Sequence, residues 1–188
     1  MIETLNAIDT KLFFALNSLA GNEVFDNINI YLSSKTFWLY IFILFSAFIL
    51  YKHKKDGLKL LGFLILTVSF TDAFTYNVLK QNIERVRPCV EYKGEVATPT
   101  GCKSMFGFPS NHAANSAAFA STVVFLGYKA IGYGFAGIAF LVGLSRVFLG
   151  VHYPGDVFFG FITGTLYSFL LIKAVNLLVN KLKKSEQN

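Results

Sequence analysis

The chain has 188 residues, of which 54% are hydrophobic, 16% aromatic and only 15% charged, and its net charge is +6. This composition differs strongly from that of a soluble domain and predicts an all-α integral membrane protein. The basic residues are scattered at the ends of apolar runs and form no continuous stripe, so we do not expect nucleic-acid binding.

The N-terminal region predicts interfacial helices. Apolar residues recur every three or four positions from Ile2 to Leu19, and polar residues occupy positions between them. This periodicity predicts an amphipathic helix that is too polar to span a bilayer and lies at its surface. A second short amphipathic helix is expected from Val24 to Leu32. Residues 1–34 are therefore interpreted as interfacial.

The rest of the chain predicts a bundle of membrane-spanning helices. The five apolar runs extend from about Leu32 to Tyr51, Leu58 to Leu79, Asn111 to Tyr128, Ile131 to Leu149 and Val157 to Val179. About 20 apolar residues are needed to cross a bilayer, so five spans are expected, or six with the N-terminal helix counted. The third run is rich in small residues, which let membrane helices approach closely, and it is expected to be central.

The sequence predicts one membrane-embedded domain, residues 1–188, with the bundle at residues 35–179 and a basic tail at residues 180–188. The positive-inside rule places this tail, and the lysines of residues 52–59 after the first span, in the cytoplasm. Alternation then places the outer ends of the second, third and fourth spans on the opposite side. The prediction is a multi-pass protein of the bacterial inner membrane, with these ends facing the periplasm or cell exterior.

The first polar cluster lies where the second span ends. Lys80 is followed after six residues by Arg87 and Pro88. Proline disfavours helical backbone in the residue before it, so the chain is expected to extend here and bring both cations to one anion. The guanidinium fork of Arg87 matches phosphate oxygens. The alternative is that the two cations only anchor lipid headgroups.

The second cluster begins the third span. Ser110 is a natural N-cap, and a helix N-terminus presents free N–H groups and a partial positive charge to an anion. Asn111 and His112 then lie in the first turn, beside any anion bound there.

The third cluster follows the fourth span and comprises Arg146, His152 and Asp156. Pro154 disfavours one continuous helix through His152 and Asp156, so a turn that leads into the fifth helix is expected. In such a turn Asp156 is expected to accept a hydrogen bond from one ring nitrogen of His152, which leaves the other nitrogen as a nucleophile.

Three other residues have two interpretations each. Cys89 and Cys102 lie in the predicted outer loop, where they form either a disulfide or two free thiols. A metal site is not expected from two thiols without an adjacent histidine. Asp72, an acid predicted to be buried in the second span, either makes a structural hydrogen bond or ion pair or acts directly in the site.

The three clusters resemble the signature motifs of the type 2 phosphatidic acid phosphatase superfamily, which also includes vanadium haloperoxidases. The resemblance implies a phosphatase without metal or cofactor, in which His152 attacks phosphorus, Asp156 orients it and His112 protonates the leaving oxygen. It implies that the phosphate is held by Lys80, Arg87, Ser110, Arg146 and backbone amides near Asn111. Asn111 stands where the family has glycine, which would let the backbone approach more closely.

A site at the outer edge of the bilayer favours a lipid whose phosphate lies at headgroup level over a soluble sugar phosphate. The expected partners are therefore the lipid bilayer and a lipid phosphate or diphosphate. Undecaprenyl diphosphate, lipid A 1-phosphate and phosphatidylglycerophosphate remain open as substrates, and the oligomeric state is not predicted. The alternative function is a non-catalytic transporter or lipid-binding protein of the same fold.

Overall fold

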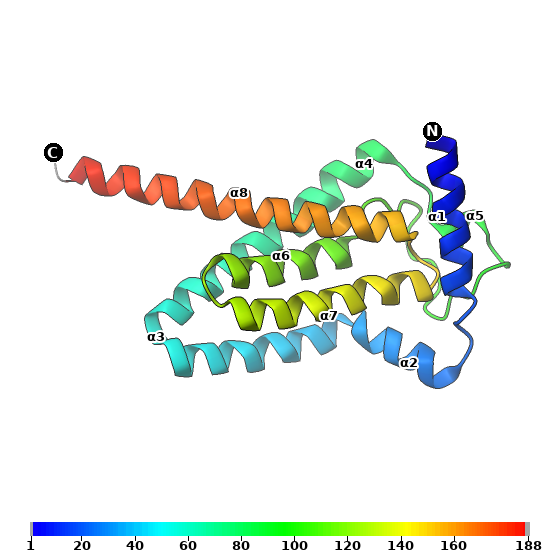
Figure 1. Cartoon of the computed structure of the whole chain (residues 1–188), viewed down its shortest axis with the longest axis horizontal. Helices are drawn as coiled ribbons and strands as arrows, with labels where there is room; N and C mark the ends of the chain where they lie inside the picture. Colours follow the sequence, from blue (N-terminus) through cyan, green and yellow to red (C-terminus); the bar gives the residue numbers. More distant parts are fainter. Residues whose placement is uncertain (1, 187–188) are drawn as a thin grey trace.

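A computed structural model of the chain describes residues 2–186, which contain helices and loops but no β-strand. The elements in chain order are α1 (Ile2–Asn17), α2 (Glu23–Leu32), α3 (Lys35–Phe74), the π-helical turn η1 (Thr75–Leu79), α4 (Lys80–Ile83), α5 (Pro88–Glu91), α6 (Asn111–Phe125), α7 (Lys129–Phe148) and α8 (Pro154–Glu186). Figure 1 shows the long helices packed side by side. The predicted all-α class is confirmed.

Within residues 2–186, three helical stretches are long and apolar enough to cross a membrane: Lys35–Ile83, Lys129–Phe148 and Pro154–Ser185. The first has 49 residues and reverses its direction at Lys54, whose φ of 44° and ψ of −113° are not helical. It therefore contains both the first and the second predicted spans. The 15-residue α6 measures only about 22 Å at 1.5 Å per residue, so the number of transmembrane helices stays a prediction.

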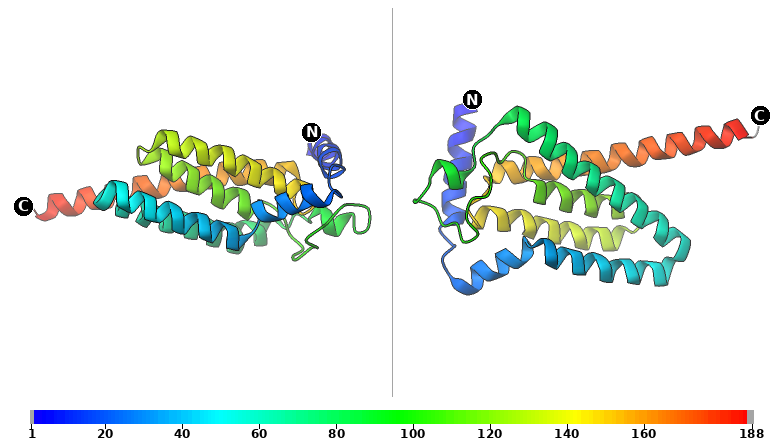
Figure 2. Two further views of the ribbon diagram at one scale, coloured as in Figure 1. Left: turned by 90° about the horizontal axis from the view of Figure 1, so that it is seen from below. Right: turned by 180° about the vertical axis from the view of Figure 1, so that it is seen from behind.

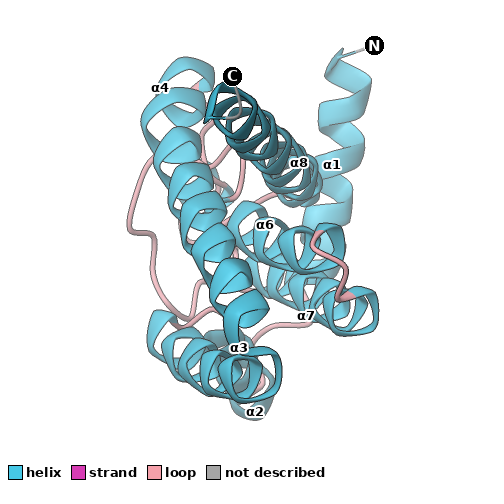
Figure 3. Cartoon of the chain, turned by 90° about the vertical axis from the view of Figure 1, so that its left-hand side faces the viewer, coloured by secondary structure: helices cyan, strands magenta, loops and turns pink. Residues whose placement is uncertain are grey.

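Helix α6 is central in the bundle, as its small residues predicted, and it contacts α3, α7 and α8 (Figure 3). Its buried face includes Ala113, Ala114 and Ala117. Opposite them, α8 presents Gly160 and Gly164, and a Cβ atom at Gly164 would collide with the backbone oxygen of Ala114. The two backbones therefore approach one another because neither carries a large side chain.

Replacing Gly164 with alanine is expected to lower the thermal unfolding midpoint of the detergent-solubilised protein, because overpacking costs about 1–3 kcal/mol. The matched control is Gly137→Ala in α7, where an added Cβ atom meets nothing within 4 Å. The midpoints are measured by intrinsic fluorescence in one detergent. If both variants unfolded at the wild-type temperature, the close α6–α8 packing would be contradicted.

Two helix ends differ from the prediction. Helix α6 ends at Phe125, before Tyr128, because Gly127 adopts a left-handed φ of 97° that leads the chain into α7. Helix α8 continues to Glu186, through the residues predicted as a separate tail, and extends beyond the other helices. Lysine is a good helix former and is favoured near a helix C-terminus, which explains the continuation.

Helix α1 lies across one end of the bundle (Figure 2). Its Phe13 is fully buried and packs with a cluster that includes Tyr153 and Val157. The Asn17 amide donates to the backbone oxygens of Ala97 (3.0 Å) and Phe148 (2.9 Å), and its oxygen accepts from the Ala97 N–H group (3.0 Å). The predicted helix is thus present and fixed to the bundle. Its place at the membrane surface stays a prediction.

Candidate active site

A cavity of about 990 Å³ lies between α3, α6 and α7. Six of the predicted site residues line it: Lys80, Arg87, Asn111, His112, Arg146 and His152. Most of the remaining wall is apolar and includes Trp38, Phe42 and Phe119. Ser110 and Asp156 are not among the lining residues, and both are fully buried. The structure therefore joins a polar cluster to an apolar chamber.

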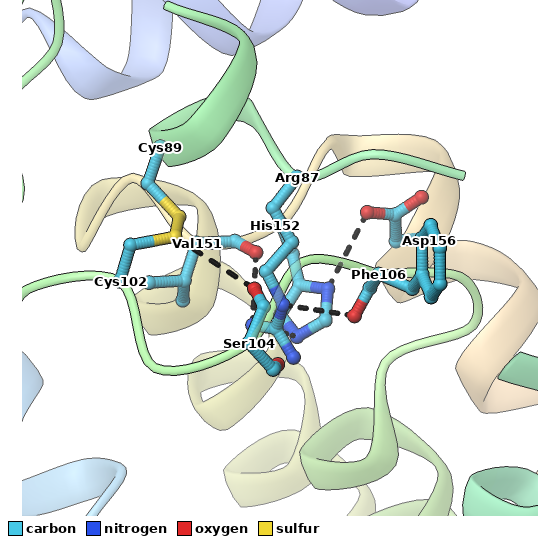
Figure 4. Close-up of a disulfide and its surroundings, with 8 residues drawn as sticks. All are labelled: Arg87, Cys89, Cys102, Ser104, Phe106, Val151, His152 and Asp156. Atoms are coloured by element: carbon cyan, nitrogen blue, oxygen red, sulfur yellow. Dashed lines mark hydrogen bonds and ion pairs between the residues drawn. A yellow bond between two sulfur atoms is a disulfide. The ribbon is translucent and has the colours of Figure 1, made fainter. Parts of the chain in front are cut away.

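His152 lies in the turn before α8 and Asp156 in the first turn of α8, and the two form the expected pair (Figure 4). His152 Nδ1 lies 3.3 Å from Asp156 Oδ2, which also accepts the backbone N–H of Tyr153 at 3.0 Å. Because an ionised carboxylate only accepts, the ring proton belongs on Nδ1. Nε2 then carries the free electron pair. Gly107 packs against this pair, and a Cβ atom there would lie 3.1 Å from Asp156 Oδ2.

Arg87 faces the free nitrogen of His152, with Nη1 3.3 Å from Nε2 (Figure 4). The guanidinium also donates to the backbone oxygens of Phe106 (2.9 Å) and Val151 (3.2 Å), which fix its position. Burial holds the pKa of His152 well below its usual range, and the positive charges of Arg87 and Lys80 lower it further. The imidazole is therefore neutral near pH 7, as a nucleophile must be.

The other two predicted cations line the same cavity. Lys80 is only 5% exposed, and its Nζ lies 3.5 Å from the Gly107 oxygen. Arg146 Nε is buried and has no partner among the described residues. Cations with unused donors at a cavity wall are suited to bind an anion.

The start of α6 contributes the other histidine. Ser110 is the N-cap, as predicted, and its hydroxyl accepts the Ala113 N–H at 3.5 Å. His112 lines the cavity, and its Nε2 lies 3.2 Å from the backbone oxygen of Ser33. With an Nε2 proton donated to that oxygen, Nδ1 is left for proton transfer. The contact with Ser33, at the junction of α2 and α3, was not predicted.

Arg85 and Asp9 were also missed by the sequence reasoning. Arg85 Nη1 donates to Asp156 Oδ1 and its Nη2 to Asp9 Oδ2, both at 2.8 Å. Asp9 Oδ1 accepts the backbone N–H of Gly155 at 2.7 Å. Arg85 also lies over the Tyr153 ring, 4.2 Å from its centroid. Helix α1 thus helps to orient the carboxylate that contacts His152. No local pattern pairs Asp9 with Arg85, which lie 76 residues apart.

We expect Arg85→Ala to lower kcat about 10–100-fold, because the buried Asp156 carboxylate loses its ion partner and its orientation. KM is expected to change little, since Arg85 is not among the residues that line the cavity. Arg85→Lys should restore part of kcat, and Lys103→Ala, which removes an exposed cation of the segment between α5 and α6, is the control. A large rise in KM with unchanged kcat would assign Arg85 to substrate binding instead.

A disulfide joins Cys89 and Cys102, whose Cα atoms are 5.8 Å apart. Of the two interpretations left open by the sequence, the structure contains the bridged form. The bridge lies in the segment between α4 and α6, beside Arg87 (Figure 4). It therefore fixes the middle of this segment to α5, close to Arg87.

Asp72 is not buried, which corrects the expectation from sequence. Its side chain is exposed and lines the cavity. Asp72 is exposed because α3 and α6 leave the cavity between them at this position. Asp72 Oδ1 accepts from Asn111 Nδ2 at 2.9 Å and from Asn115 Nδ2 at 2.7 Å.

The apolar helices indicate a membrane protein, and the cations that line the cavity beside His152 are suited to bind a phosphate-like anion. The sequence model of the PAP2 superfamily matches residues 57–179. The chain is 37% identical to phosphatidylglycerophosphatase B of Bacillus subtilis, over 80% of this chain and 73% of the relative. It is 32% identical to a lipid A 4'-phosphatase of Bacteroides thetaiotaomicron, over 87% and 75%.

The solved transmembrane PAP2 type phosphatidylglycerolphosphate phosphatase of Bacillus subtilis has a similar fold, with a TM-score of 0.68 and 30% identity. The match covers 92% of this chain and 87% of that structure. The chain belongs to the PAP2 superfamily. With these relatives, it is a lipid phosphatase of the membrane.

Proposed function

We propose that the protein removes a phosphate from a membrane lipid phosphate or diphosphate through a phosphohistidine at His152. The observation that carries this proposal is the free Nε2 of His152 beside Arg87, in a cavity whose remaining wall is mostly apolar. A lipid fits such a cavity with its phosphate at the cations and its tail along the apolar wall.

In the first step, the phosphate oxygens replace His152 as the acceptor of the Arg87 N–H groups and also contact Lys80 and Arg146. The Nε2 electron pair then forms a bond with phosphorus while the bond to the leaving oxygen breaks. His112, which starts this step protonated on both ring nitrogens, gives that oxygen its Nδ1 proton and becomes neutral. The Nδ1–H group of His152 remains hydrogen-bonded to Asp156, and this carboxylate stabilises the positive charge that develops on the ring.

In the second step, water attacks phosphorus and His112, now neutral, takes a proton from it. The phosphorus–nitrogen bond breaks, its electron pair returns to Nε2, and inorganic phosphate leaves. The protein's own cations meet the charge of the phosphate throughout, aided by the N-terminus of α6 near Ser110 and Asn111. We therefore propose turnover without a metal ion.

We further propose that the site faces the periplasm or cell exterior from the bacterial inner membrane, which rests on the lysine distribution. Phosphatidylglycerophosphate and a lipid A phosphate are supported as substrates by the names of the relatives. Undecaprenyl diphosphate is the third candidate and rests on the resemblance alone.

The test is phosphate release by the detergent-purified protein in excess chelator, with His152→Ala as the blank. The panel contains phosphatidylglycerophosphate, lipid A, undecaprenyl diphosphate and phosphatidic acid. Release from one lipid far above the others identifies the substrate. No release from any lipid by a folded protein would overturn the proposal, and release that stops in chelator would overturn its metal independence.

A further inference from the structure

Asp72 presents a carboxylate to the cavity and forms no ion pair with any of the described residues. Its Oδ1 accepts from the amides of Asn111 and Asn115, and none of the described residues donates a hydrogen bond to Oδ2. No ion pair of the described part of the chain includes Asp72. Two amides thus fix the orientation of the carboxylate, while one oxygen stays available as an acceptor.

Such a carboxylate is costly in a membrane-spanning helix. A purely structural acid in this position would be expected to turn into the bundle, but Asp72 is exposed in the cavity. Because an ionised carboxylate can only accept hydrogen bonds, the ligand group that it favours is a donor such as a hydroxyl. It disfavours a purely apolar or purely acceptor group at the same place.

The position of Asp72 relative to the cations sets the size of that ligand. Asp72 and Lys80 lie on the same helical stretch, separated by the π-helical turn η1, and both line the cavity. Eight residues correspond to about 12 Å along a helix, and the Lys80 side chain tilts back toward the helix N-terminus, which is the direction of Asp72. The gap that remains fits a short polar unit between the phosphate and the tail.

We propose that Asp72, oriented by Asn111 and Asn115, binds a hydroxyl group of the substrate headgroup, so that the enzyme selects a phosphate carried on a hydroxyl-bearing glycerol or sugar unit. This inference rests on the proposed lipid phosphatase function. It adds a specificity site that is separate from the groups that contact phosphorus.

The experiment compares two lipids that differ only in one hydroxyl: phosphatidylglycerophosphate and the analogue in which 1,3-propanediol replaces its headgroup glycerol. We expect wild-type kcat/KM to be at least about tenfold higher for the hydroxyl lipid, since hydrogen bonds to charged groups contribute about 1.5–3 kcal/mol. Asp72→Asn should reduce this ratio toward one, and Asn115→Ala should reduce it less. Asp56→Asn, which lies in α3 just after the reversal at Lys54, should keep the wild-type ratio.

A second pair of lipids, a lipid-linked hexose phosphate and its deoxy analogue, distinguishes a sugar headgroup from glycerol. The pair that gives the larger wild-type ratio of kcat/KM contains the headgroup unit that the enzyme selects. The inference is overturned if the wild-type ratio is near one in both pairs, or if Asp72→Asn keeps it. It is also overturned if Asp72→Asn lowers kcat/KM equally for both lipids of a pair, since Asp72 then only supports the start of α6. If the wild type released phosphate from none of the lipids, the proposed function itself would be wrong.

Discussion

Replacing His152 with alanine is expected to reduce phosphate release by at least about 10³-fold, because the substitution removes the only group placed to bond with phosphorus in the proposed mechanism. KM is less informative here, since Arg87, Lys80 and Arg146 remain to bind the phosphate. The measurement is a single-turnover assay with ³²P-labelled lipid, which also detects label on the protein. Wild type should show acid-labile label, and His152→Ala should show none.

The chain offers a matched control in His53→Ala. The protein has three histidines, and His53 lies at the bend of α3, where its ring packs against Tyr128. This variant should retain both activity and labelling. Because His152 is only 1% exposed, folding of His152→Ala must be verified by its elution and thermal midpoint in detergent. A folded variant that kept more than a few per cent of the wild-type rate would exclude His152 as the nucleophile.

Replacing His112 with alanine is expected to lower the rate about 10²–10⁴-fold on lipids with a poor leaving group. The loss should be much smaller in the first step of a diphosphate, whose leaving phosphate needs no proton. Phosphatidic acid and diacylglycerol diphosphate provide this comparison with identical tails, and His53→Ala is again the control. If both lipids lost the same factor in single-turnover phosphoryl transfer, the general-acid role would be wrong.

The same variant separates the two steps of the reaction. His112 is proposed to activate water in the second step, so His112→Ala should accumulate phosphohistidine from the diphosphate lipid while releasing little phosphate. Rapid-quench labelling with ³²P measures this accumulation directly. Fast release of phosphate without accumulated label would show that another group activates the water.

The parts of this protein that depend on local sequence were predictable. Small residues predicted the central place of α6, and Ser110 its N-cap. Pro154 predicted the turn that brings Asp156 back to His152, because proline cannot continue a helix at that point. Each of these features arises from residues within a few positions of one another.

The parts that depend on long-range packing were not predictable. The bond from His112 to the Ser33 oxygen joins residues 79 positions apart, and no residue type indicates which backbone oxygen will be met. The exposed position of Asp72 depends on the space left between α3 and α6, and the periodicity of the sequence does not reveal how two helices pack. The same reason explains why the support of Asp156 by Arg85 was missed.

The contacts of Arg85 have a consequence for the biogenesis of the enzyme. Arg85 joins Asp9 of the first helix to Asp156 of the last, so this set of contacts is complete only when both helices have packed together. Synthesis runs from the N-terminus, and Asp156 lies in the first turn of α8, so it is the last of the predicted site residues to be made. In the proposed mechanism, full activity therefore requires that the first and the last helix have both packed against the segment that carries Arg85.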